Sequence, residues 1–128
     1  MLTQENGILI PVGEYSTLPE EETVQSTASA IRLDESQRFL YVSNRGHESI
    51  CRYRLKENRL TDPIWIQSMG CSPRDFQLAG AYLLCANEKS NKIVSISLRK
   101  HTPQVVSEIK IPGPWAIGLG QQFSGNYE

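Results

Sequence analysis

Phe39-Leu40-Tyr41-Val42-Ser43-Asn44-Arg45-Gly46-His47 is the stretch that decides the fold, because an apolar and aromatic run passes directly into a polar turn with a glycine. The same order of residue types returns 43 residues later, in Tyr82-Leu83-Leu84-Cys85-Ala86-Asn87-Glu88-Lys89-Ser90. The chain therefore contains an internal repeat. Pairs that continue the match at this constant offset are Asn44 with Asn87, Ile50 with Ile93, Tyr53 with Ile96 and Leu55 with Leu98.

The period of the repeat favours one architecture. Several short strands in a period of roughly 40 to 45 residues are typical of β-propeller blades. Helical repeats of similar length need apolar residues three and four apart over ten or more positions, and this chain has no such stretch. We therefore expect an all-β fold of four-stranded antiparallel repeats, which form an incomplete segment of a propeller.

The expected blades divide the chain into four parts. Residues 7–29 provide an outer strand and loop of a preceding blade, residues 30–69 the first full blade, residues 70–111 the second, and residues 112–128 the start of a closing blade and a polar tail from Gln121. Strands are predicted at 7–13, 30–33, 39–43, 49–55, 64–69, 74–78, 82–86, 92–98, 105–111 and 115–118, with a solvated loop at 16–29.

Composition and charge exclude several classes of protein. With 39% hydrophobic and 21% charged residues the chain reads as globular rather than disordered. A net charge of −1 gives no reason to expect nucleic acid or an anionic membrane as a partner. The N-terminus has neither the basic region of a signal peptide nor a run long enough to span a membrane.

The three cysteines, Cys51, Cys71 and Cys85, are odd in number and lack metal-ligand spacing. Two of them lie in strand-like runs, where cysteine usually serves as a small buried hydrophobe. Reduced thiols in a cytoplasmic protein are the simplest interpretation. The acidic run 20–22 is typical of a solvated surface rather than of a metal site. We expect no metal and no cofactor.

Three segments in order resemble signatures of the lactonase seven-bladed propellers, the family that includes 6-phosphogluconolactonase and the fungal carboxymuconate-lactonising enzymes. They are Phe39 to His47, Gly70-Cys71-Ser72-Pro73-Arg74-Asp75-Phe76, and Tyr82-Leu83-Leu84-Cys85-Ala86-Asn87. The resemblance covers roughly residues 7–118. Since the family's chains are well over twice as long, the resemblance is to their C-terminal third.

Two smaller departures from the family lie in turns. The segment Asp34-Glu35-Ser36-Gln37 lacks the glycine that usually precedes the first signature, and Glu88 stands where the family commonly has glutamine. Turns tolerate such changes, so the expected fold is unaffected.

The resemblance implies hydrolysis of a sugar lactone, in which negative charge develops on the carbonyl oxygen and must be stabilised. By resemblance Arg45 is an arginine of the family's cleft, able to hold a phosphate or carboxylate or to stabilise that oxygen. The alternative is an ion pair with an acid of a neighbouring blade. Arg74 is a second candidate for substrate binding, with the same alternative.

His47 and Asn44 complete the predicted site. A histidine titrates near neutrality and could act as general base, although a histidine in a turn is more often a surface residue. Asn44 is assigned to substrate binding, but its recurrence as Asn87 also favours a turn role, because asparagine bonds its own backbone. The catalytic candidates are thus Arg45 and His47, and the binding candidates Arg74 and Asn44.

Two functions stay open from the sequence. The first is a lactonase, or part of one, that acts on a phosphorylated sugar lactone, with that small molecule as its partner. The second is a non-catalytic propeller fragment that serves as an interaction or structural module. In either case open blade edges favour self-association, because unpaired strands and apolar faces meet water.

Overall fold

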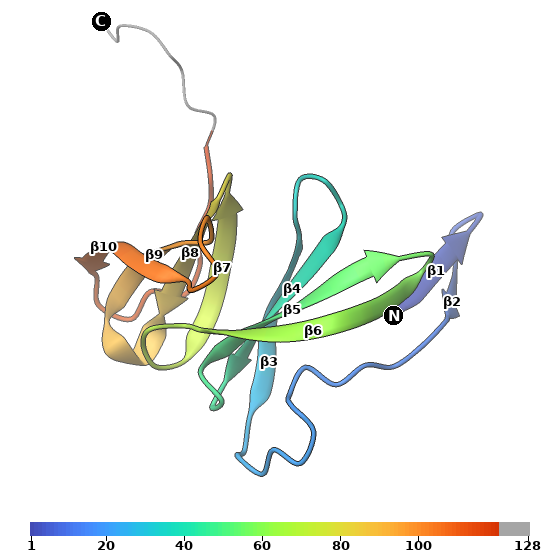
Figure 1. Ribbon diagram of the computed structural model, residues 1–128, viewed down its shortest axis with the longest axis horizontal. Coiled ribbons are helices and arrows are strands. Elements are labelled where there is room, and N and C mark those ends of the chain that lie inside the picture. Colours follow the sequence, from blue (N-terminus) through green and yellow to red (C-terminus); the bar gives the residue numbers. More distant parts are fainter. Residues whose placement is uncertain (121–128) are drawn as a thin grey trace, which may run out of the picture.

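The computed structural model describes residues 1–120 and folds them into three antiparallel sheets (Figure 1). The first is a hairpin, and the other two have four strands each and a meander order. The strands are β1 (Leu2–Glu5) and β2 (Ile8–Pro11); β3 (Thr27–Leu33), β4 (Phe39–Arg45), β5 (Ser49–Lys56) and β6 (Arg59–Gln67); β7 (Pro73–Ala79), β8 (Tyr82–Asn87), β9 (Lys92–Ser97) and β10 (Gln104–Lys110). A short 3₁₀ helix, η1 (Glu88–Ser90), follows β8. The predicted tail from Gln121 lies outside the described residues.

The two four-stranded sheets confirm the predicted antiparallel blades, and local turn chemistry explains their hairpins. Glu57 and Asn58, between β5 and β6, have φ of 51° and 60°, as a tight turn with two left-handed residues requires. Between β3 and β4, the Asp34 carboxylate accepts hydrogen bonds from the amides of Arg38 and Phe39, both at 2.9 Å. Gln37 takes the left-handed conformation there, at φ 60°, so this turn forms without a glycine.

The hydrophobic core lies between the two blades, where β3 and β4 face β7 (Figure 1). One face of the first sheet contributes Tyr41, Ile50 and Ile66, and one face of the second contributes Phe76 and its neighbours. The rings of Tyr41 and Phe76 are tilted against each other with 6.4 Å between centroids, a favourable aromatic arrangement. The core residues from the second blade are Phe76, Leu83, Cys85, Val94 and Ile96, all fully buried.

Equivalent asparagines fasten the connection that enters each blade. In the second blade Asn87 donates from Nδ2 to the carbonyl of Ser68, at 2.8 Å. In the first blade Asn44 donates from Nδ2 to the carbonyl of Thr17, at 2.7 Å, and its Oδ1 accepts from the Thr17 hydroxyl, also at 2.7 Å. Both asparagines are fully buried, and each amide nitrogen is satisfied by a backbone carbonyl of the connection it holds.

Several sequence-based expectations need correction. The strand predicted at 30–33 begins at Thr27, inside the segment predicted as a loop at 16–29. The single strand predicted at 7–13 is a hairpin of β1 and β2, and the strand predicted at 64–69 begins at Arg59, with a bulge near Asp62. No strand forms at 115–118, because this segment has no neighbouring strand in its own sheet among residues 1–120. Its backbone is bonded through Ile117 to side chains instead.

The connection from residue 12 to residue 26 is more ordered than the predicted solvated loop. The carbonyl of Thr17 accepts a second hydrogen bond, from the Trp65 indole at 2.9 Å, and the carbonyl of Ser16 accepts one from the Tyr53 hydroxyl. The connection is therefore tied to three strands of the first blade. In the part of the chain that is described, no helix is long and apolar enough to cross a membrane.

Candidate functional site

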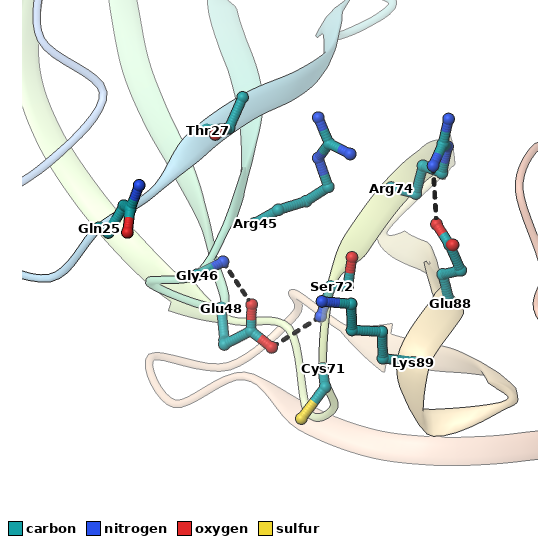
Figure 2. Close-up of a pocket in the computed structure, with 10 residues that line it drawn as sticks. All are labelled: Gln25, Thr27, Arg45, Gly46, Glu48, Cys71, Ser72, Arg74, Glu88 and Lys89. Carbon is teal, nitrogen blue, oxygen red and sulfur yellow. Dashed lines mark hydrogen bonds and ion pairs between the residues drawn. The ribbon is translucent and has the colours of Figure 1, made fainter.

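A cavity of about 600 Å³ opens at one end of the junction between the two blades (Figure 2). It lies where β4 ends and where β3 and β7 begin, so residues far apart in the sequence meet there. Two arginines from equivalent ends of adjacent blades contribute to its wall. The lining residues are Gln25, Thr27, Arg45, Gly46, Glu48, Cys71, Ser72, Arg74, Glu88 and Lys89.

Arg45 forms no ion pair with any carboxylate among residues 1–120, and neither does the exposed Lys89 on the same wall. The side chain leaves the last position of β4 and is partly buried, and its Nε is buried without a hydrogen bond. No described carboxylate lies within ion-pair distance of its guanidinium. In Figure 2 this side chain extends away from Glu48, on the side of the cavity where Arg74 also lies. The ion pair with an acid of a neighbouring blade, which the sequence left as an alternative, is not formed with any residue between 1 and 120.

Arg74 is already engaged on two sides. Its Nη1 donates to Glu88 Oε2 at 3.0 Å, and its guanidinium carbon lies 4.2 Å from the centre of the Trp115 ring. The carboxylate belongs to the same blade as Arg74, so the ion pair fixes the arginine within its own blade. A ligand would therefore compete with Glu88 for the Nη1 donor of Arg74.

Glu48 links two of the segments that line the cavity. One carboxylate oxygen accepts from the Gly46 amide and the other from the Ser72 amide, both at 2.6 Å (Figure 2). The turn after β4 is thereby tied to the connection that enters the second blade. Gly46 is required here, because its φ is +109° and a Cβ would lie 2.2 Å from the carbonyl oxygen of Gln25.

The charges of the cavity favour an anion. The lining residues include three cations, Arg45, Arg74 and Lys89, and two carboxylates, Glu48 and Glu88, so the sum is 3 − 2 = +1. Both carboxylates accept the hydrogen bonds described above. Within residues 1–120 the cavity therefore offers a free guanidinium but no free general base.

His47 lies outside the residues that line this cavity. Its Nδ1 is 2.7 Å from the Ser49 hydroxyl and its Nε2 is 3.4 Å from Glu22 Oε2. Hydrogen bonds from the amides of Val24 and Thr23, with the nearby histidine, lower the pKa of the Glu22 carboxyl despite the opposing effect of desolvation. This series of serine, histidine and glutamate is not a nucleophile system, because Ser49 is only 3% exposed.

The structure brings Arg45 and Arg74 together and places His47 and Asn44 elsewhere, at the connection 12–26. Sequence reasoning missed Glu48, which follows Arg45 by three positions in the same polar turn, and it treated Glu88 only as a departure from the family. The sequence signal that could have identified Glu48 is its position three residues after the candidate Arg45. Among the residues described, no group of three or more His, Cys, Asp or Glu is arranged to hold a metal ion.

Comparison with solved structures agrees with the fold. A Lactobacillus plantarum protein superimposes with a TM-score of 0.80 at 26% identity, over 90% of this chain and 36% of that one. The periplasmic gluconolactonase of Pseudomonas aeruginosa has a TM-score of 0.76 at 21% identity, over 88% of this chain and 34% of its own. A proposed 6-phosphogluconolactonase of Bacteroides fragilis has a TM-score of 0.75 at 22% identity, over 90% of this chain and 33% of its own.

Sequence relatives and a family model identify the family to which the chain belongs. Uncharacterised proteins of Staphylococcus aureus strains USA300 and N315 are 38% identical over 86 residues, which are 64% of this chain and 25% of theirs. The chain thus spans about a quarter of these relatives and about a third of the similar solved structures. The family model of the lactonase seven-bladed β-propeller matches residues 1–117. The chain belongs to the lactonase seven-bladed β-propeller family.

Proposed function

We propose that this chain carries the anion-binding part of the active site of a lactonase that hydrolyses a phosphorylated sugar lactone. The observation that carries the proposal is the unpaired guanidinium of Arg45 on a cavity where two blades meet. A similar gluconolactonase and a proposed 6-phosphogluconolactonase support this class of substrate.

Lactone hydrolysis adds water across the ring ester. The water oxygen bonds to the carbonyl carbon, the bond from that carbon to the ring oxygen breaks, and the ring oxygen takes a proton to give the open hydroxy acid. Negative charge builds on the carbonyl oxygen before the bond breaks. A guanidinium can stabilise this oxygen or grip the phosphate with two parallel hydrogen bonds. Arg45 is free for either role, whereas Arg74 supports the wall of the site through Glu88.

Arg45 cannot be the general base, because arginine stays protonated in proteins. The two carboxylates of the cavity are bound to amides or to Arg74. The base would therefore come from outside residues 1–120. This same observation favours the second candidate, a non-catalytic binding or structural module, for the 128-residue chain on its own.

The proposal is tested by titrating the ¹⁵N-labelled chain with 6-phosphogluconate, the open product, and following backbone amide shifts by NMR. We expect millimolar binding, with shifts centred on Gly46, Ser72 and Glu88, and at least tenfold weaker binding in Arg45→Ala. Arg59→Ala is the matched control. Arg59 is exposed, and it pairs with Lys56 beside the β5–β6 turn, at the end of the first blade opposite to the cavity.

Two results would contradict the proposal. One is an unchanged affinity in Arg45→Ala, and the other is an equal loss in both arginine variants, which would indicate attraction by overall charge alone. Gluconate, which lacks the phosphate, separates the two possible roles of Arg45. If gluconate binds as well as 6-phosphogluconate, the arginine recognises the carboxylate rather than the phosphate.

A further inference from the structure

A second cavity, of about 710 Å³, opens at the other end of the junction between the two blades. Its lining combines Arg52 of β5 and Ile64 of β6, from the first blade, with the connection after β9 in the second. Strand β9 runs between this connection and the turn that contains Glu88, so the cavity is distinct from the one that Arg45 lines. Both of its walls belong to complete four-stranded sheets.

Basic side chains from both blades gather at this second cavity, and no carboxylate lines it. The connection after β9 contributes Arg99, Lys100 and His101, and the first blade contributes Arg52. We call these four residues the basic cluster. Its two arginines and its lysine form no ion pair with any carboxylate among residues 1–120. Because like charges repel, an anion between the two walls would be attracted by both.

Arg52 is the member of the basic cluster that lies deepest in the fold. Its side chain is partly buried, and its Nε is buried without a hydrogen bond. Its guanidinium carbon lies 4.6 Å from the centre of the Phe39 ring. The equivalent residue of the second blade, 43 positions later, is Ser95, so the packing of a blade does not require an arginine here. The fold thus orients this guanidinium but gives its Nε no acceptor.

Arg99 is oriented in a similar way from the second blade. Its guanidinium carbon lies 5.3 Å from the centre of the Tyr82 ring. Contact with an aromatic face restricts a guanidinium while its N–H donors stay free for another partner. Guanidinium donors match the oxygens of a phosphate and can bind them in pairs. Lys100 and His101 are exposed beside Arg99 and add further donors.

Two carboxylates, those of Asp34 and Glu35, line an adjoining cavity of about 570 Å³, which Arg52 also borders. Neither lies within ion-pair distance of Arg52. The carboxylate of Asp34 already accepts hydrogen bonds from two backbone amides of its own turn. These acids repel an anion from the adjoining cavity, so the favoured position for an anion is on the side of Arg99.

We propose that the basic cluster binds a small molecule that carries phosphate groups, at a site separate from the cavity of Arg45. The cavity volume, about 710 Å³, lies within the range of small-molecule sites. The overall charge of −1 conceals this site, because its cations are brought together from positions 52 and 99–101 only by the packing of the two blades. The proposal does not depend on lactone hydrolysis.

Titration of the ¹⁵N-labelled chain with inorganic pyrophosphate tests the proposal, with backbone amides and arginine Nε–H groups followed by NMR at constant ionic strength. We expect millimolar binding, with shifts at residues 98–102 and at the Nε–H of Arg52 and Arg99. Arg52→Gln and Arg99→Gln should each weaken this binding at least about tenfold, because each removes hydrogen bonds to a charged group.

Arg54→Gln is the matched control. Arg54 also lies over the Phe39 ring, at 5.6 Å, but it is 4.0 Å from Asp62 and does not line the cavity. The variant removes the same charge from the same strand, and it should bind pyrophosphate like the wild type. Arg99 is exposed, so Arg99→Gln still tests the site if the amide spectrum shows that Arg52→Gln is unfolded.

Four results would overturn the proposal. The first is the absence of shifts at residues 98–102 at tens of millimolar pyrophosphate. The second is an equal loss of binding in Arg54→Gln and Arg52→Gln, which would indicate attraction by overall charge. The third is the disappearance of these shifts in Arg45→Ala, which would show that the two cavities are not separate sites. The fourth is tighter binding of citrate than of pyrophosphate, which would assign the basic cluster to carboxylates.

Discussion

Arg32 and Asp75 form an ion pair across the junction of the two blades, with 2.9 Å between Nη2 and Oδ1. The arginine comes from β3 and the aspartate from β7, the inner strands of the first and second blades. The second oxygen of Asp75 accepts the amide of Ile117. One carboxylate thus connects three successive inner segments, and it is almost buried while doing so.

Replacing Asp75 by alanine should destabilise the chain by about 2 kcal/mol, since hydrogen bonds to a charged group contribute about 1.5 to 3 kcal/mol and Arg32 is partly solvated. Urea unfolding followed by tryptophan fluorescence measures the change. Asp62→Ala is the control, because Asp62 is 77% exposed and 4.0 Å from Arg54. Equal effects of the two variants would show that Asp75 is not a structural link.

Gly46→Ala should lower the free energy of unfolding by at least about 2 kcal/mol, because a side chain at φ +109° is strained and would clash with the Gln25 carbonyl. Gly80→Ala provides the comparison. Gly80 also has a positive φ, +60°, but a Cβ there would meet nothing within 4 Å. The Gly80→Ala substitution should therefore lower the free energy of unfolding by only about 1 kcal/mol. Thermal unfolding that ranks Gly80→Ala as the worse variant would refute the close approach at Gly46.

The cysteines should differ in reactivity. Burial raises the pKa of the Cys51 thiol to about 11 and that of Cys85 to about 12, while Cys71 is exposed. At pH 8 a thiol reagent should therefore label one cysteine per folded chain and three in urea, because the thiolate is the reactive form. Mass spectrometry that finds rapid labelling of Cys85 in the folded chain would contradict this burial.

The same two thiols give a pH dependence of stability. Their pKa values are higher in the folded chain than the ordinary value of 9.0, so folding favours the neutral thiol. Their contribution is complete below about pH 9 and is lost as pH rises toward 11 and 12. Cys51→Ser with Cys85→Ser should flatten the decline of stability between pH 9 and 11. A decline that is unchanged in this double variant would assign it to other groups.

The repeat was enough to predict both blades, because strand alternation and turn residues are local properties of the sequence. Arg45 and Arg74 line one cavity because they lie at the same end of adjacent blades, Arg45 at the end of β4 and Arg74 at the start of β7. The roles of Asn44 and Glu48 could not be predicted, since they depend on contacts with Thr17 and Ser72 across long sequence separations. The strand expected at 115–118 failed for a related reason, because a strand needs a neighbouring strand as well as a suitable sequence.

The 128-residue chain alone should hydrolyse 6-phosphogluconolactone no faster than buffer. Its cavity has a free guanidinium in Arg45, but the carboxylates of Glu48 and Glu88 are engaged, and His47 is held between Glu22 and Ser49 away from the lining. Without a base to activate water, the reaction lacks general-base catalysis, which typically contributes about 10²- to 10⁴-fold. A pH-stat assay at pH 7 measures acid release against a buffer blank.

Arg45→Ala and His47→Ala decide how any activity would be interpreted. Turnover above the blank that disappears in Arg45→Ala and persists in His47→Ala would show that the two blades suffice, with a water or substrate group as base. A different result would support the catalytic role that the sequence predicted for His47. In that case turnover is lost in His47→Ala but kept when Glu48 is replaced by Gln, Asn or Ala. The connection 12–26 would then have to open for His47 to reach the substrate. Because Glu22 is exposed, a Glu22→Gln variant that frees the His47 ring should then accelerate the reaction rather than abolish it.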